Sequence, residues 1–229
     1  MDLLTILITA SFIPSHPSIK IIQETIESLK LINIPTNTKI ILAHDYNSSN
    51  NYSKYLKKLN EYIKSYSNIE IVIRTTHGCL TGNIRNALQY INSKYLLVIQ
   101  HDLPFIKCVD IQKVIEDMEE NNNIKYVRFN KRKNIKTGSD VINFLFGLQQ
   151  KQKNYTYTRT PAWSDNNHLC LTSYYTSIIM KECQDGGFME HKLQGKIKNE
   201  EIHKKYGTYI FGELNHPQII KHTDGRKSR

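Results

Sequence analysis

Short apolar runs alternate with helical segments through the first 130 residues. The apolar runs cover residues 3–9, 39–43, 69–74, 95–100 and 124–129. Between them, apolar residues recur at helical spacing, for example at Ile19, Ile22, Ile26 and Leu29. Strands that alternate with helices in this way are typical of βαβ units, in which the strands lie parallel. The pattern therefore predicts an α/β fold with a mostly parallel central sheet flanked by helices.

Polar residues follow the predicted strands. In sheets of this kind, ligands bind at the carboxyl ends of the strands. The residues found there are Ala10-Ser11, His44-Asp45, Arg74-Thr75 and Gln100-His101-Asp102. A carboxylate at such a strand end can hold a divalent cation that bridges a diphosphate. Asp102 is therefore a candidate metal ligand; the alternative is an aspartate that only caps the next turn.

The pattern changes after residue 130. Residues 131–138 predict a basic turn region, and residues 149–157 are polar without a clear period. Residues 169–180 fit either a strand or a helix. The sequence contains no internal repeat. We therefore expect the second half to extend the first half rather than to form an independent domain.

The chain carries a net charge of +10, which attracts polyanions such as nucleic acid or the diphosphate of a nucleotide. A nucleic-acid-binding protein without enzymatic activity is one alternative, and the fourteen tyrosines would be its stacking platforms. Against it, Lys and Arg do not cluster into one stripe, and no helix-turn-helix, ribonucleoprotein or zinc-finger pattern occurs. The sequence also lacks the HxH and HExxH motifs of metal hydrolases. We expect no nucleic-acid partner.

The apolar runs are too short to cross a bilayer, which takes about 20 apolar residues. Asp2 stands where a signal peptide would carry bases, and Pro14 and Pro17 cut short the first apolar stretch. The four cysteines are widely spaced and form no CxxC pair. We therefore expect a cytoplasmic protein with reduced cysteines and no transmembrane segment.

Residues 77–87 lead through one predicted helix into the strand that ends at Asp102. They contain a glycine and an Arg-Asn pair, Arg85-Asn86, and the strand ends in Gln100-His101-Asp102. In family-2 glycosyltransferases, a similar glycine and Arg-Asn pair precede a strand that ends in an Asp-x-Asp motif. Roughly residues 3–130 thus resemble that family, in particular its small stand-alone members in large DNA viruses and bacteria.

The resemblance implies a GT-A (Rossmann-like) nucleotide-diphospho-sugar transferase fold in a single domain, residues 1–229. Residues 1–130 would form the nucleotide-sugar-binding half, and residues 131–229 the acceptor-binding half and C-terminal tail. The donor substrate would be a nucleoside-diphosphate sugar, with UDP ahead of GDP or TDP. The residues expected to bind it are Thr9, Ala10, Ser11, Asp45, Arg74, Arg85, Gln100, His101, Asp102 and Arg226. A viral origin would place the protein in the host cytoplasm.

The resemblance also implies Mn²⁺ or Mg²⁺ on Asp102. The first aspartate of the family motif is Gln100 in this chain, so the site has one carboxylate fewer. Many transferases of this fold return a C-terminal histidine to the metal or diphosphate, and His222 fits that place. Arg226 could offset the charge on the leaving diphosphate. A disordered basic tail is the alternative for this segment.

Sugar transfer to a hydroxyl needs a general base near the anomeric carbon. In inverting members of the resembled family, an acidic residue at a helix start in the second half has this role. Glu190 fits best, and Asp165 is its rival. Trp163 either stacks on a sugar from an exposed position or anchors the core. Glu200 and Glu201 are typical of a solvated helix face.

The resemblance thus predicts a hexosyl- or deoxyhexosyl-transferase that moves a sugar from a nucleoside-diphosphate sugar to a glycan or other hydroxyl acceptor. Inversion and a divalent metal are part of this prediction. A sugar nucleotidyltransferase is the remaining alternative. That class usually has a Gly-rich phosphate loop after the first strand, whereas residues 11–17 contain no glycine.

Overall fold

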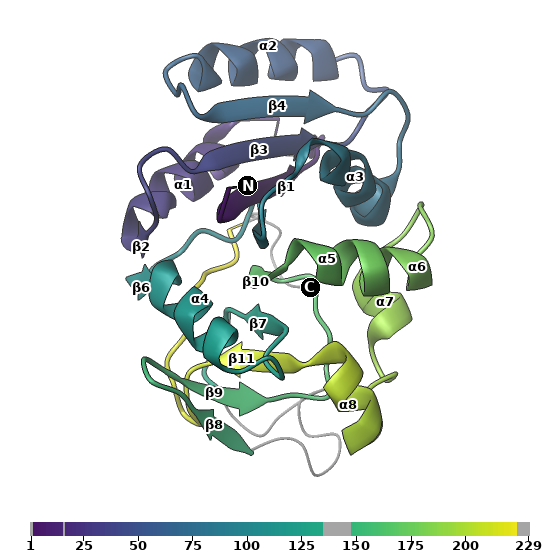
Figure 1. The fold of residues 1–229 in the computed structure, drawn as a ribbon. Coiled ribbons are helices and arrows are strands. Elements are labelled where there is room, and N and C mark those ends of the chain that lie inside the picture. Colours follow the sequence, from purple (N-terminus) through teal and green to yellow (C-terminus); the bar gives the residue numbers. More distant parts are fainter. Residues whose placement is uncertain (1, 16, 135–147, 224–229) are drawn as a thin grey trace.

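The computed structural model describes residues 2–15, 17–134 and 148–223. In these residues, one large sheet has the strand order β4-β3-β1-β5-β10-β7-β11-β9-β8 (Figure 1). Its strands are β1 (Leu4–Ala10), β3 (Lys39–His44), β4 (Ile69–Ile73), β5 (Tyr95–Gln100), β7 (Tyr126–Arg128), β8 (Gln149–Lys151), β9 (Thr156–Arg159), β10 (His168–Leu171) and β11 (Thr208–Phe211). A small separate sheet pairs β2 (Ile32–Asn33) with β6 (Val109–Asp110).

The longer helices are α1 (Lys20–Ser28), α2 (Tyr52–Ile63), α3 (Cys79–Ala87), α4 (Ile111–Glu120) and α8 (Glu200–Tyr206). The shorter ones are α5 (Thr172–Tyr174), α6 (Met180–Glu182) and α7 (Met189–Leu193). A π-helical turn, Tyr175–Ile179, joins α5 to α6. Two 3₁₀ turns, Leu29–Leu31 and Leu88–Tyr90, extend α1 and α3. In the described parts of the chain, no helix has the length and apolarity to cross a membrane.

The predicted α/β fold is confirmed, and its parallel part is the first half. Strands β4, β3, β1 and β5 are all parallel, and Ile8 of β1 pairs with Leu42 on one side and Ile99 on the other. Beyond β5 the sheet is mixed: β10 runs antiparallel to both of its neighbours, whereas β7 and β11 are parallel. Residues 169–180 contain both of the predicted alternatives, the end of β10 followed by α5 and the π-helical turn.

Strands β8 and β9 were not predicted from the sequence. Residues 149–157 are polar because β8 is an exposed edge strand whose side chains do not enter the core. Tyr157 and Thr158 of β9 are fully buried, but the strand is too short to reveal an alternating pattern. Both strands pair antiparallel and extend the sheet away from β5.

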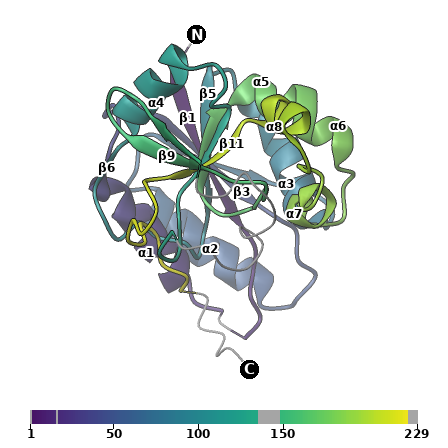
Figure 2. The same cartoon turned by 90° about the horizontal axis from the view of Figure 1, so that it is seen from below.

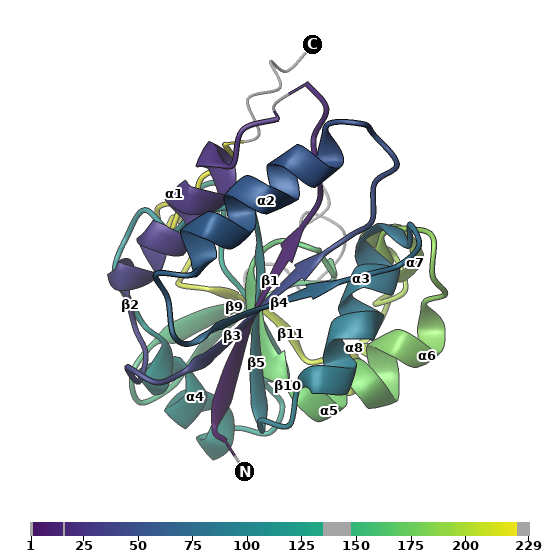
Figure 3. The same cartoon turned by 90° about the horizontal axis from the view of Figure 1, so that it is seen from above.

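Alternate residues of the central strands face opposite sides of the sheet. In β5, Leu97 and Ile99 enter the core beneath α1, α2 and α4, whereas Leu96 and Val98 enter the core beneath α3 and the α5–α7 region. Views along the sheet show the same two layers, with α1, α2 and α4 on one side and α3 and α5–α8 on the other (Figures 2 and 3). The central strands are therefore buried on both faces, which explains their continuous apolar runs.

A buried carboxylate on α4 anchors the edge of the sheet. The Asp117 side chain is 0% exposed. It accepts hydrogen bonds from the backbone N–H groups of Asn154 and Tyr155 at 2.9 and 3.0 Å, and from the Tyr157 hydroxyl at 2.8 Å. A buried carboxylate is stable only with such a set of donors. Asp117 therefore fixes the turn between β8 and β9 against α4.

Replacing Asp117 by Ala should lower the free energy of unfolding by about 3 kcal/mol or more, because several buried donors lose their acceptor. Urea denaturation monitored by circular dichroism measures this loss. Glu120→Ala is the matched control, since Glu120 is an exposed carboxylate on the same helix, 4.0 Å from the Lys153 ammonium. We expect its effect to stay below about 0.5 kcal/mol. Equal effects of the two substitutions would contradict the anchoring role.

Candidate functional site

A cavity of about 400 Å³ lies at the carboxyl ends of β1, β3 and β5. Its walls come from the residues that follow these strands, from the start of α3 and from one aromatic side chain of the loop before α7. Among its lining residues are Thr9, Ala10, Ser11, Asp45, His77, Cys79, Asn83, Gln100, His101, Asp102 and Phe188. Seven residues expected to bind the donor thus line one cavity: Thr9, Ala10, Ser11, Asp45, Gln100, His101 and Asp102.

Parallel pairing brings these strand ends together. Thr9 lies opposite Ala43 on one side and Gln100 on the other, so the three strands end at the same level. Asn83 of α3 then ties two of the ends together. Its side-chain amide donates to the carbonyls of Ala43 at 2.8 Å and Ala10 at 3.3 Å. Asn83 was not among the predicted site residues, because only the tertiary packing of α3 shows which side of that helix faces the strand ends.

Asp45 is buried in the cavity wall and holds the loop before α3. Its Oδ1 accepts hydrogen bonds from the N–H groups of Gly78 at 3.0 Å and Tyr46 at 3.1 Å. Its Oδ2 lies 2.8 Å from Nδ1 of His77. The carboxylate is thus fixed from two directions. His77 and Cys79, which also line the cavity, were not among the predicted site residues.

The C-terminal segment returns to Asp102. Nε2 of His222 lies 3.1 Å from Oδ2 of Asp102. The backbone holds this arrangement, because the N–H of Thr223 donates to the Asp102 carbonyl at 2.9 Å and the N–H of Lys221 to the Pro104 carbonyl at 3.1 Å. Segments that lie 120 residues apart in sequence therefore meet at Asp102, which lines the cavity. Arg226 lies outside the described residues.

Asp102 and His222 are the residues suited to a metal ion. Oδ1 of Asp102 is buried and has no hydrogen-bond partner, so it is a carboxylate oxygen available to a cation. Within the described ranges, no group of three or more His, Cys, Asp or Glu side chains is placed to hold a metal. Mg²⁺ and similar ions often use one or two protein ligands and take the rest from phosphates and water. The residues therefore fit a metal that binds together with a diphosphate.

Gln100 links the strand end to a loop in the second half. Its side-chain amide donates to the Asp165 carbonyl at 2.6 Å, and its backbone N–H donates to Oδ1 of Asn167 at 3.0 Å. The amide nitrogen carries no lone pair for a metal. Gln100 is therefore engaged in positioning the loop of residues 165–167.

The two candidate bases, Asp165 and Glu190, lie next to each other. Oε2 of Glu190 accepts hydrogen bonds from the hydroxyl of Ser164 at 2.9 Å and from the N–H of Asp165 at 3.0 Å. The N–H of Glu190 in turn donates to Oδ2 of Asp165 at 3.3 Å. Burial of Asp165 raises the pKa of its carboxyl to about 7, and the nearby charge of Glu190 adds to this effect.

Residues 11–180 match the sequence profile described as Glycosyl transferase family 2. The chain belongs to this family. No curated protein matches the chain in sequence. Among solved structures, the Staphylococcus aureus TarS fragment 1–349 with UDP-GlcNAc superimposes with a TM-score of 0.60 and 11% identity, over 100% of this chain and 60% of that one. A second TarS structure superimposes with a TM-score of 0.57 and 14% identity, over 97% of this chain and 37% of that one.

A mannosyltransferase from Pyrobaculum calidifontis, with GDP-Man and Mn²⁺, gives a TM-score of 0.53 at 9% identity. The superposition covers 76% of this chain and 46% of the mannosyltransferase. These likenesses confirm the predicted GT-A fold. This family 2 chain spans about 60% of the length of the TarS fragment.

In this family 2 chain, Arg74 and Arg85 lie outside the lining of the cavity. The Arg74 guanidinium donates to the Gly82 carbonyl at 2.5 Å and packs so closely that a Cβ on Gly78 would lie 2.6 Å from it. Arg85 pairs with Asp185 at 2.8 Å and donates to the Met180 carbonyl. The Arg74 guanidinium also lies 3.5 Å from Asp185 and 3.9 Å from Asp45 of the cavity wall. Both arginines therefore fasten α3 and the loop after α6, a role that the sequence pattern did not indicate.

Trp163 is the core anchor and not the exposed stacking residue. Its side chain is 0% exposed, and its ring lies 5.6 Å from that of Tyr126. Phe188, which is 50% exposed, lines the cavity, as does the buried Phe12. Glu200 and Glu201 are exposed at the start of α8, as expected for a solvated helix face.

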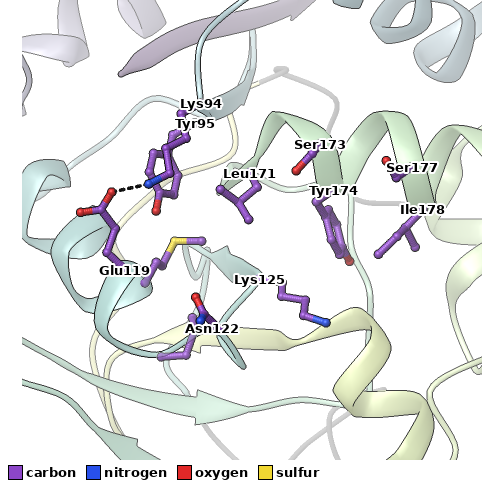
Figure 4. A pocket seen from close by; sticks show the side chains of 12 residues that line it. Lys94, Tyr95, Glu119, Asn122, Lys125, Leu171, Ser173, Tyr174, Ser177 and Ile178 are labelled. Atoms are coloured by element: carbon purple, nitrogen blue, oxygen red, sulfur yellow. Dashed lines mark hydrogen bonds and ion pairs between the residues drawn. The ribbon is translucent and has the colours of Figure 1, made fainter. Parts of the chain in front are cut away.

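A larger cavity, of about 620 Å³, lies near the beginning of β5, at the opposite edge of the sheet (Figure 4). Its charged groups bind one another or the backbone. The Lys94 ammonium lies 2.6 Å from the Glu119 carboxylate, and that of Lys125 donates to the Lys204 carbonyl at 2.8 Å. Glu119 is the one carboxylate in its lining. The smaller cavity, at the carboxyl ends of the strands, is therefore the candidate site.

Replacing Asp165 by Asn tests the raised pKa. The folded chain keeps the Asp165 proton up to about pH 7, whereas the ordinary pKa of the group is 3.8. Between these values the folded state holds more protons than the unfolded state, so the free energy of unfolding falls as pH rises. Asn keeps the acceptor for the Glu190 N–H but does not ionise. Relative to wild type, the variant should gain on the order of 3 kcal/mol between pH 4 and pH 8.

Urea denaturation of both proteins across this pH range measures the difference, in which the contributions of all other groups cancel. A constant difference between the two proteins would show that the Asp165 carboxyl titrates normally.

Proposed function

We propose that this chain transfers a hexosyl or deoxyhexosyl group from a nucleoside-diphosphate sugar to a hydroxyl of a glycan or other acceptor, with inversion at the anomeric carbon. The observation that carries the proposal is the cavity at the carboxyl ends of β1, β3 and β5 in a family 2 chain. Ligands of open α/β sheets bind at this edge. Membership of the family favours this activity over the nucleic-acid-binding and nucleotidyltransferase alternatives.

The donor substrate fits the arrangement of the cavity. Thr9, Ala10 and Ser11 form the wall beside Asp45, where the base and ribose would lie. The diphosphate would then lie toward Asp102. Three of the similar solved structures contain UDP-GlcNAc, UDP and GDP-Man, which are nucleoside diphosphates or their sugars. A UDP-sugar is our first choice of donor, ahead of GDP- and TDP-sugars.

We assign the metal site to Asp102 and His222. Their carboxylate and imidazole groups are ligands that Mn²⁺ accepts, and Mg²⁺ would rely mainly on the carboxylate. When bound, the cation would neutralise charge that develops on the departing diphosphate. The buried, unpartnered Oδ1 of Asp102 supports this assignment.

Glu190 is our choice for the base that takes the proton of the acceptor hydroxyl. It is partly exposed, whereas both the side chain of Asp165 and its Oδ1 atom are buried. An incoming hydroxyl can therefore reach Glu190 more easily. Asp165, with a pKa of about 7, is well matched in pKa to proton transfer at neutral pH. Asp165 would set the charge beside Glu190, and it remains the rival base.

Replacing Asp102 by Asn should reduce donor turnover about 100- to 1,000-fold, because a charge-stabilising group at the diphosphate is lost. Turnover is measured as nucleotide release from a panel of UDP-, GDP- and TDP-sugars, with and without Mn²⁺. Calorimetry of UDP binding should show that Mn²⁺ strengthens binding to wild type and not to the variant.

Glu70→Gln is the control for this experiment, since Glu70 is a half-exposed carboxylate of β4 that pairs with Lys39. Full turnover by Asp102→Asn would rule out the proposed metal and diphosphate site.

Replacing Glu190 by Gln should lower turnover about 100- to 10,000-fold while UDP binding stays unchanged, because a general base contributes to the chemical step. Glu24→Gln on α1 is the control, as Glu24 is a partly exposed carboxylate near Lys20. Asp165→Asn, assayed across pH, shows whether the ionisation near pH 7 limits the rate. If Glu190→Gln keeps its rate and Glu201→Gln loses it, the base lies at the start of α8 instead.

A further inference from the structure

In one wall of the cavity, a thiol, an imidazole and a carboxylate form a series in which each group contacts the next. Sγ of Cys79 lies 3.4 Å from Nε2 of His77. On the other side of the imidazole ring, Nδ1 of His77 lies 2.8 Å from Oδ2 of Asp45 and 3.2 Å from the Tyr46 carbonyl. The role we proposed for the cavity does not use the thiol.

The surroundings of His77 determine which ring nitrogen carries the proton. The Asp45 carboxylate and the Tyr46 carbonyl are both acceptors, so Nδ1 must be the donor. In the neutral ring, Nε2 then presents a lone pair to the Cys79 thiol. Asp45 cannot turn away, because the N–H groups of Gly78 and Tyr46 hold its other oxygen. This is the arrangement that activates a nucleophile: a thiol, a base and a group that orients the base.

The backbone places Cys79 where small molecules can reach it. Its φ of +54° lies in the left-handed region, which a residue with a side chain adopts at a cost of about 1–2 kcal/mol. The residue is half-buried, lines the cavity and begins α3. The N-terminal end of a helix stabilises negative charge that develops on a nearby atom such as this sulfur.

We propose that Cys79 is a nucleophilic modification site for small carbon electrophiles that carry a leaving group. In the step, the Cys79 thiol gives its proton to Nε2 of His77. The sulfur electron pair forms the new S–C bond, and the leaving group departs with the electrons of the bond that breaks. The adduct then occupies the cavity and excludes the sugar nucleotide; this last consequence rests on the proposed function.

Iodoacetamide labelling of the native protein, followed by peptide mass spectrometry, tests the proposal. The chain contains its own controls: Cys108 is exposed, and Cys170 and Cys183 are buried. We expect Cys79 to react at least about tenfold faster than Cys108, although it is less accessible. His77→Gln should remove that advantage and leave the Cys108 rate unchanged. Unlabelled Cys170 and Cys183 in the variant would show that it is folded.

Labelling of Cys79 no faster than Cys108 would overturn the proposal, as would an unchanged Cys79 rate in His77→Gln. A second arm separates this site from the sugar-nucleotide site. UDP with Mn²⁺ should slow labelling of Cys79 and not of Cys108. If Cys79 is labelled rapidly and UDP, GDP and TDP all fail to protect it, the proposal of a nucleophilic Cys79 is kept. The placement of the nucleotide in this cavity is then rejected.

Discussion

The parallel pairing of β3, β1 and β5 is the constraint on which the rest of the site depends. Because the register aligns Ala43, Thr9 and Gln100, the three chains leave the sheet at one level and their next residues meet. The strands are buried on both faces, so a slip by one residue would exchange the side chains that pack in the two cores and would move the strand ends out of line. Asn83 then fixes the ends of β1 and β3 to α3 through two carbonyl groups. The core thus determines the geometry of the cavity.

The second half of the chain completes the site from both sides. The segment of residues 219–223 runs beside residues 102–106 and brings His222 to Asp102. From the other side, the loop after α6 is held at α3 by Arg85 and by the bond from the Thr81 hydroxyl to the Gly187 carbonyl at 2.7 Å. That loop carries Phe188 into the cavity wall. Contacts far apart in sequence therefore hold the parts that would meet the acceptor.

The sequence predicted the strands and their ends correctly where a clear apolar pattern was present. Strands buried on both faces have apolar runs that locate their ends, so Asp45 and Asp102 could be placed at the cavity before the fold was known. The polar edge strand β8 has no such apolar run. An aromatic residue such as Trp163 suits a core and a surface that stacks on a sugar equally well, so its residue type alone did not decide between the two. The series from Cys79 through His77 to Asp45 depends on a backbone turn with a positive φ and on the approach of two loops. Spacing along the chain does not reveal such a contact.

Gln100 shows how one substitution can change the way a site is held together. An aspartate at this position would add a negative charge beside Asp102 and would have no N–H to offer the Asp165 carbonyl. Gln100 instead donates to that carbonyl at 2.6 Å, so the end of β5 is bound to the loop next to Glu190. Where an aspartate would provide an anionic group, Gln100 therefore provides a link between the end of β5 and the second half of the chain. With one carboxylate at the strand end, the attraction for a cation would depend more on the phosphates that arrive with it, and the proposed metal binding would then be coupled to nucleotide binding.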